Sequence, residues 1–274
     1  MKTFLSKIKT SIYFGGLAVG LSLGLNSANA GEILIGIPAA QSGPVGVADH
    51  TDFTNGALMA IEEINATGGV NGHTLSTKII DLNMLTPEGN VAGILNLVES
   101  GVHAIASAFT IIPQPAMDAA APSGIPYLHG NTSSVNVELY QGNPEKYKNI
   151  LQLDVAEVWY GTGFVRFLSD LKASGQWVPK NNKVHIVQGQ ISYTQNISKA
   201  TQKKIAETNG EWEVAAITDI QFPVQDWAPV IRALQDTDAA AIMIDHWIAA
   251  ELAAFAQQYA CLLYTSDAAD DSLR

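Results

Sequence analysis

The stretch VHAIASAFTIIPQPAMDAAAPSGIPYLHG, residues 102–130, places a helical segment between two short apolar runs. The runs VHAIASAF and IPYLHG are typical of buried strands, and residues 114–121 between them are typical of a short helix. Strands that alternate with helices of this length pair in parallel, and helices then cover both faces of the sheet. This stretch therefore predicts an α/β fold with a parallel sheet.

The same alternation continues on both sides of this stretch. Upstream, the pattern predicts strands at 33–39 and 74–82 and helices within 52–69 and 87–100, the second with Thr86 as its N-cap and Pro87 in its first turn. Downstream, it predicts helices at 155–173, 195–208, 224–235 and 248–260 and strands at 183–189, 212–220 and 240–247. The polar, turn-rich stretch 130–154 separates the two series, so we place the crossover between two lobes there. The sequence thus predicts two doubly wound parallel-sheet lobes, residues 31–150 and 151–260, the second of them incomplete.

Residues 1–30 have the anatomy of a secretory signal peptide. Three early lysines precede an uncharged apolar stretch, and the small residues Ala28-Asn29-Ala30 follow it. The apolar stretch, Ile12 to Leu25, is short of the roughly 20 residues that a membrane anchor needs. No cysteine lies near the cleavage point, so a lipid anchor has no attachment site. We expect a cleaved signal and a periplasmic mature protein.

The last segment, residues 261–274, does not fit the helix pattern before it. The single cysteine of the chain, Cys261, opens the sequence CLLYTSDAADDSLR, which resembles translated sequencing-adapter read-through. We interpret this tail as artefactual and expect the natural chain to continue differently after Ala260. A genuine frayed C-terminus is the alternative.

The composition excludes several classes of partner. The formal net charge of −11 makes nucleic acid and anionic lipid surfaces poor partners, because phosphate groups require a basic patch. Charged residues make up 15% of the chain and hydrophobic ones 47%, which indicates a large globular core. We expect a monomer that binds a small molecule.

Polar or aromatic groups follow four of the predicted strands. They are Gln41-Ser42-Gly43, Thr110, the segment 129–133 and His246-Trp247. In parallel α/β sheets a ligand lies outside the carboxyl ends of the strands. Hydroxyl and backbone N–H groups at these ends suit a carboxylate, an amide or an ammonium. The pattern predicts a site for a small polar ligand.

Four segments carry a family resemblance. They are SGPVG at 42–46, GALMAIEEINATGGVNG at 56–72, PQPAMDAAAPSGIPYL at 113–128 and QDWAPVIRALQDTDAAAIMI at 225–244. Together they resemble the type I periplasmic substrate-binding proteins of ABC transporters, in the branched-chain amino acid and amide group. The likeness runs from about Gly31 to Ala260. It implies a two-lobed clamp that closes on one ligand and delivers it to a membrane permease.

The resemblance also implies roles for individual residues. Thr110 matches the position whose hydroxyl holds a ligand carboxylate, and Asn131 and Ser133 match a loop that holds the carboxylate and amine. Tyr193 matches an aromatic of the second lobe, and Trp247 lies near another. The family acid that pairs with a ligand ammonium would lie beyond this sequence. The resemblance assigns that role to no residue here.

Two positions depart from the family pattern. Val47-Ala48 are small where amino-acid binders often carry an aromatic residue, and Phe109 stands before Thr110 where smaller residues are common. We therefore predict ligand contacts at Ser42, Thr110, Asn131, Ser133, Tyr193 and Trp247 and leave open which amino acid or amide is bound.

Structural roles compete with these functional ones. Thr110 is also placed to cap the following helix, the segment 131–133 is also typical of a polar loop, and Tyr193 and Trp247 are also typical of partly buried packing residues.

No cofactor or enzymatic activity is expected from the sequence. The six histidines show no metal-ligand spacing, and Gly161-Thr162-Gly163 lacks the third glycine of the dinucleotide fingerprint. No Gly-x-Ser-x-Gly or His-Glu-x-x-His motif suggests a nucleophile or a catalytic metal site. The ligand-sensing module of a receptor and, with less support, an exported amidase-type enzyme are the alternatives to a transport protein.

Overall fold

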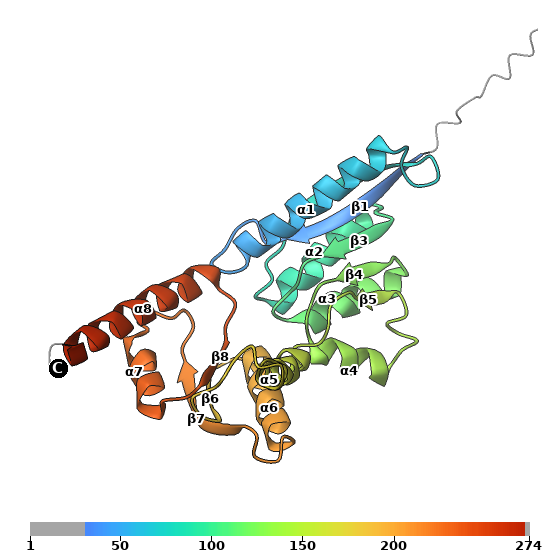
Figure 1. Cartoon of the computed structure of the whole chain (residues 1–274). Helices are drawn as coiled ribbons and strands as arrows, with labels where there is room; N and C mark the ends of the chain where they lie inside the picture. The colour runs from blue at the N-terminus through green and yellow to red at the C-terminus, as the bar shows by residue number, and fades with distance from the viewer. Residues whose placement is uncertain (1–30, 272–274) are drawn as a thin grey trace, which may run out of the picture.

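Two parallel sheets organise the chain into two lobes (Figure 1). The structure is a computed structural model that describes residues 31–271, with the side chains of residues 31–261. The predicted signal peptide lies outside the described residues. The observed sheets confirm the predicted fold class of two parallel α/β units.

The first sheet has five strands in the order β2-β1-β3-β4-β5, and all neighbouring pairs are parallel. Its strands are β1 (Glu32–Ala39), β2 (Thr74–Asp81), β3 (Ala104–Ser107), β4 (Tyr127–His129) and β5 (Ile150–Gln152). The helices of this lobe are α1 (Val47–Ala66), α2 (Pro87–Glu99), α3 (Pro113–Ala120), the 3-10 helix η1 (Ala121–Ser123) and α4 (Ser134–Gly142). At the predicted cap of α2, Thr86 Oγ1 accepts a hydrogen bond from Gly89 N at 3.1 Å.

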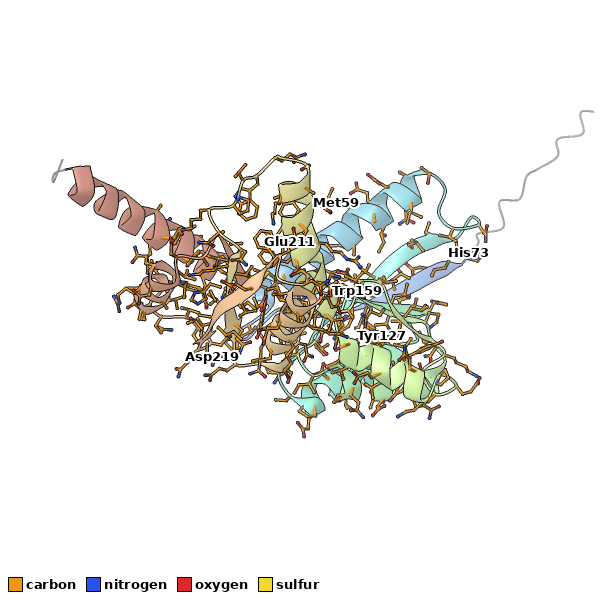
Figure 2. All side chains as sticks on the ribbon, turned by 60° about the horizontal axis from the view of Figure 1, so that its bottom comes forward. Met59, His73, Tyr127, Trp159, Glu211 and Asp219 are labelled. Carbon is orange, nitrogen blue, oxygen red and sulfur yellow. The ribbon has the colours of Figure 1, made fainter. Side chains whose placement is uncertain are left out.

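The second sheet has three parallel strands in the order β7-β6-β8. Its strands are β6 (Lys183–Gly189), β7 (Glu213–Ile220) and β8 (Ala241–Asp245). The helices are α5 (Val158–Ala173), α6 (Ser192–Ala206), α7 (Ala228–Thr237) and α8 (Ala249–Asp271). Figure 2 shows Trp159, in the first turn of α5, between the ribbons of the two lobes.

Each lobe buries its own apolar core. In the first lobe, residues of α2, α3 and the central strands form one cluster, including Leu97, Ile105, Met117 and Tyr127. In the second lobe, β6 divides its side chains between the two faces of the sheet. Val184 and Ile186 pack with α5 and α6, whereas Val187 packs with α7. Full burial of an aliphatic side chain of this size contributes about 1.5–3 kcal/mol.

Two parts of the structure differ from the sequence prediction. The stretch 130–154, predicted as an irregular crossover, contains α4 and β5, which belong to the first lobe. These elements have 9 and 3 residues, too short for a clear periodic pattern. At the other end, α8 continues through the tail to Asp271, because its sequence contains no glycine or proline that would stop it.

Helices α5 and α6 approach closely at Gly161. A Cβ atom at this position would lie 2.6 Å from Thr201 Oγ1 and 2.7 Å from Thr201 N, inside van der Waals contact. The neighbour is helix backbone, which cannot move aside cheaply. Gly161 is therefore required by helix packing, in a stretch where glycine otherwise lowers helix stability.

We predict that Gly161→Ala forces α5 and α6 apart and lowers the free energy of unfolding by about 1–3 kcal/mol, the usual cost of overpacking. Gly163→Ala on the same helix is the matched control, because nothing lies within 4 Å of its Cβ position. The control should be neutral or stabilising by up to about 1 kcal/mol, since alanine favours the helix. Urea denaturation of both variants measures the difference, and equal effects would contradict the close approach.

A second packing feature is the buried carboxyl of Asp245 at the end of β8. Asp245 is 2% exposed, and neither of its oxygens has a hydrogen-bond partner within residues 31–261. Burial disfavours the charged form and raises the pKa of Asp245 from 3.8 to about 7. The folded state therefore binds a proton that the unfolded state releases above pH 3.8.

This shift predicts a loss of stability as the pH rises from 3.8 to about 7, the interval between the unfolded and folded pKa values. Asp245→Asn removes the ionisation at nearly constant shape. It should raise the melting temperature at pH 8, where the charge costs on the order of 4 kcal/mol, and leave it nearly unchanged at pH 4. Calorimetry of both proteins at the two pH values tests this. An equal change at both would show that the carboxyl is not held protonated.

Candidate ligand-binding site

A cavity of about 560 Å³ lies between the two lobes. Its walls come from the loops after β3 (109–113), β4 (130–135), β6 (190–196) and β8 (Trp247), together with the start of α5. All four loops follow the carboxyl ends of parallel strands, where a ligand is expected in this class of fold. The volume suits a molecule of amino-acid or small-drug size.

Five of the six predicted ligand residues line this cavity. They are Thr110, Asn131, Ser133, Tyr193 and Trp247. Ligand contact by these residues remains a prediction, since the cavity places them together without showing what they bind. Thr132, from the predicted strand-end segment 129–133, also lines it, whereas sequence reasoning missed Glu157, Tyr160 and Asn196. Glu157 and Tyr160 lie within the helix predicted at 155–173 and Asn196 within that at 195–208, and nothing in their spacing pointed to the cavity.

Ser42, the sixth predicted residue, is not among the residues that line the cavity. It is exposed at the end of β1, where its hydroxyl donates to Asp81 Oδ2 at 2.5 Å. Asp81 Oδ1 also accepts from the main-chain N–H groups of Gln41 and Ser42. The Ser42 hydroxyl and these N–H groups lower the pKa of Asp81. The end of β1 is therefore tied to the end of β2.

Asn131 fixes the main chain of Thr110. Its Oδ1 accepts from Thr110 N at 2.9 Å, and its Nδ2 donates to Thr110 O at 3.2 Å. The loops after β3 and β4 are thereby locked to each other, and the Asn131 side chain is occupied. The Thr110 hydroxyl, in contrast, is buried and has no partner within residues 31–261. It does not cap α3, whose N-cap residue is Ile112. The protein therefore leaves the hydrogen-bonding capacity of this hydroxyl unused.

The second lobe supplies an aromatic wall. Tyr193 and Trp247 meet edge to face with ring centroids 5.7 Å apart, and Trp247 stacks on Phe222 at 5.0 Å. Thr132 Oγ1, from the first lobe, donates to Tyr193 Oη at 3.1 Å, so this hydrogen bond crosses the cleft. Burial raises the pKa of Tyr193, and the phenol is therefore neutral at physiological pH. The two lobes are in contact on one side of the cavity.

Glu157, just before α5, is the buried carboxylate of the cavity wall. It is 1% exposed. Its Oε2 accepts from Ser134 N at 2.5 Å, and its Oε1 accepts from Ser134 Oγ at 2.8 Å and from Asn196 Nδ2 at 2.9 Å. The carboxylate thus lies at the N-terminus of α4, where helix N–H groups favour a negative charge, and reaches α6 of the other lobe. No local sequence pattern indicates this role, because its partners are distant in the chain.

The two histidines at strand ends do not line the cavity. His129 is 1% exposed, and burial lowers its pKa to about 4. His246 Nε2 lies 2.8 Å from Glu251 Oε2 within the second lobe. In the described part of the chain, no group of three or more His, Cys, Asp or Glu residues is arranged to hold a metal ion. Nor does any helix of that part have the length and hydropathy to cross a membrane.

The chain is similar to curated binding proteins over most of its length. It is 26% identical over 230 residues to the leucine-specific-binding protein of Salmonella typhimurium, an alignment that covers 84% of this chain and 57% of that protein. The chain thus spans little more than half the length of the curated relatives it matches.

Solved structures share the fold. A Silicibacter pomeroyi protein assigned to branched-chain amino acid ABC transport is 28% identical, with a TM-score of 0.75 over 84% of this chain and 58% of that chain. A solute-binding protein from R. palustris in complex with benzoate is 15% identical, with a TM-score of 0.64 over 84% of this chain and 59% of that chain, a likeness of fold alone. The family model described as periplasmic binding protein matches residues 32–261. The chain therefore belongs to the periplasmic binding protein family.

Proposed function

We propose that this protein is an extracytoplasmic solute-binding protein that captures an amino acid, an amide or a related small polar molecule and delivers it to an ABC permease. The observation that carries the proposal is the cavity between the lobes, walled by the carboxyl ends of β3, β4, β6 and β8. The similarity to a leucine-specific-binding protein supports an amino-acid-sized ligand. The proposal includes export by a cleaved signal peptide and a monomeric binding protein without catalytic activity.

The proposed mechanism is closure of one lobe, residues 31–150, against the other, residues 151–260. A ligand in the cavity meets Thr110 and Ser133 from the first lobe and Tyr193 and Trp247 from the second. In an open form, the ligand contacts the residues of only one lobe. The ligand therefore binds the closed form more tightly, and its binding shifts the population toward closure by that difference in affinity.

A thermal-shift screen tests the proposal directly. The exported protein is heated with amino acids, short amides, urea and small aromatic acids. Because a ligand that binds only the folded state stabilises it by about 2.7 kcal/mol at a hundred times its Kd, one class should raise the melting temperature clearly. The same ligand should reduce the radius of gyration in solution scattering. A screen in which no class shifts the melting temperature would contradict the binding function.

Thr110→Val should weaken binding of the ligand found in this screen by roughly 5- to 150-fold, because a hydrogen bond to a buried group is worth about 1–3 kcal/mol. The ligand-free protein should keep its melting temperature, since the Thr110 hydroxyl has no protein partner to lose. Thr54→Val is the matched control: its hydroxyl is also buried without a partner in the described chain, but Thr54 is not among the residues lining the cavity. Calorimetric titration measures the affinity of both variants for this ligand. Wild-type affinity in Thr110→Val would exclude a ligand contact at Thr110.

A further inference from the structure

A second concave site lies outside the inter-lobe cavity. It has a volume of about 590 Å³, and its walls come from α4 of the first lobe and from α5 and α6 of the second. Trp159 and Arg166 of α5 and Lys199 and Lys203 of α6 are among its lining residues, and we call it the α5–α6 groove. Within residues 31–261, Asn196 is the one residue that lines both this groove and the inter-lobe cavity. The groove is therefore a separate site with a different set of side chains.

Positive charge is concentrated in the α5–α6 groove. Four cations and two carboxylates line it, namely Arg166, Lys199, Lys203, Lys204, Glu138 and Glu207. Lys204 is paired with Glu207 at 3.1 Å. The ion pairs of residues 31–261 include none of the other three cations. The groove thus has a net charge of +2, in a chain whose formal net charge is −11.

The cations are placed to share one anion. Lys199 and Lys203 are exposed and one helical turn apart on α6, so their Cβ atoms lie about 5–6 Å from each other. Like charges at this spacing repel and destabilise the helix. Arg166 comes from α5, and its guanidinium offers the planar pair of donors that a carboxylate or a phosphate accepts. An anion held between the two helices would relieve the repulsion and accept hydrogen bonds from both helices.

The groove also offers an aromatic surface. Trp159 lies in the first turn of α5, between the ribbons of the two lobes in Figure 2, and 54% of it is exposed. Arg166 follows seven residues later, two helical turns along the same face, which corresponds to about 10 Å along the helix axis. Thr162 lies between them and also lines the groove. A ring on Trp159 and a negative charge at Arg166 are therefore within the reach of one small molecule.

From these observations we infer that the α5–α6 groove is a second binding site, and that it takes a small organic dianion with an aromatic body. Two negative charges match the net charge of the groove, and its volume lies in the usual range of about 300–1,000 Å³ for small-molecule sites. Phosphate monoesters and dicarboxylates share this chemistry. The inference concerns a site apart from the inter-lobe cavity and does not depend on the proposed function.

Four probes test the ligand class by calorimetric titration of the exported protein at about pH 7.5, where a phosphate monoester carries nearly two charges. Phenyl phosphate and phenylsuccinate combine a ring with a dianion, inorganic phosphate lacks the ring, and benzyl alcohol lacks the charge. At least one of the first two should bind fivefold or more tightly than the last two, and the tighter one identifies the anionic group. Binding should weaken as the salt concentration rises from about 50 to 500 mM, because these charges are partly exposed. Failure of both aromatic dianions to bind would overturn the inference.

A pair of double variants locates the anion. Lys199→Gln with Lys203→Gln should weaken the tighter dianion by roughly five- to thirtyfold, the range expected when two partly exposed charge pairs are lost. Lys78→Gln with Lys148→Gln is the matched control, since it changes the net charge equally at exposed lysines that line neither site. The control should alter the affinity by less than twofold. Equal losses in both double variants would show that only the overall charge matters and would overturn the site.

Trp159→Ala tests the aromatic part of the inference. It should weaken the tighter aromatic dianion by roughly two- to tenfold, as expected for the loss of one stacked ring pair, and leave the affinity for inorganic phosphate unchanged. Because Trp159 is largely exposed, this variant should keep the wild-type melting temperature. An unchanged affinity for the aromatic dianion would show that the ring does not contact Trp159.

Two further outcomes separate this inference from the alternatives. A ligand from the thermal-shift screen, added at saturation, should not displace the dianion, and displacement would place the anion in the inter-lobe cavity instead. Binding of an acidic peptide without binding of either aromatic dianion would make the groove a protein-docking surface and overturn the small-molecule class. Either result leaves the proposed solute-binding function intact, because that function is tested at the other site.

Discussion

The buried carboxylate of Glu157 is the contact on which the arrangement of the two lobes depends. It receives hydrogen bonds from the start of α4 in one lobe and from α6 in the other, and it lies just before α5, the first helix of the second lobe. Hydrogen bonds to a charged group contribute about 1.5–3 kcal/mol each, and a buried charge that loses its partners is strongly destabilising. The position of one lobe relative to the other is therefore coupled to the satisfaction of this charge.

The remainder of the cavity follows from the geometry of parallel sheets. Because all strands of a sheet point the same way, the loops at their carboxyl ends gather at one edge, and the two sheets bring two such edges together. Local contacts then fix the loops. Asn131 holds the main chain of Thr110, and Thr132 reaches Tyr193 across the cleft. The polar groups of the first lobe face an aromatic wall of the second, an arrangement suited to a ligand with one polar and one apolar end.

Sequence reasoning located the elements with strong local signals. The strand predicted at 183–189 is β6, and Thr86 caps α2 as its neighbour Pro87 indicated. It missed α4, whose first N–H group is satisfied by Glu157, 23 residues further along the chain. It also placed Ser42 with the other strand-end residues, but Ser42 bonds to Asp81 at the end of the neighbouring strand. Both differences arise from partners that are distant in the sequence.

The sequence by itself determined the fold class and the strand ends that carry the cavity, because periodicity and helix boundaries are local properties of the chain. It also determined the family, through motifs that span most of residues 31–260. Only the tertiary structure decided which strand ends meet, that the Thr110 hydroxyl has no partner within residues 31–261, and that the Glu157 carboxylate lies in the cavity wall. Burial and charge compensation are properties of the whole arrangement, because they depend on every group that surrounds an atom in space.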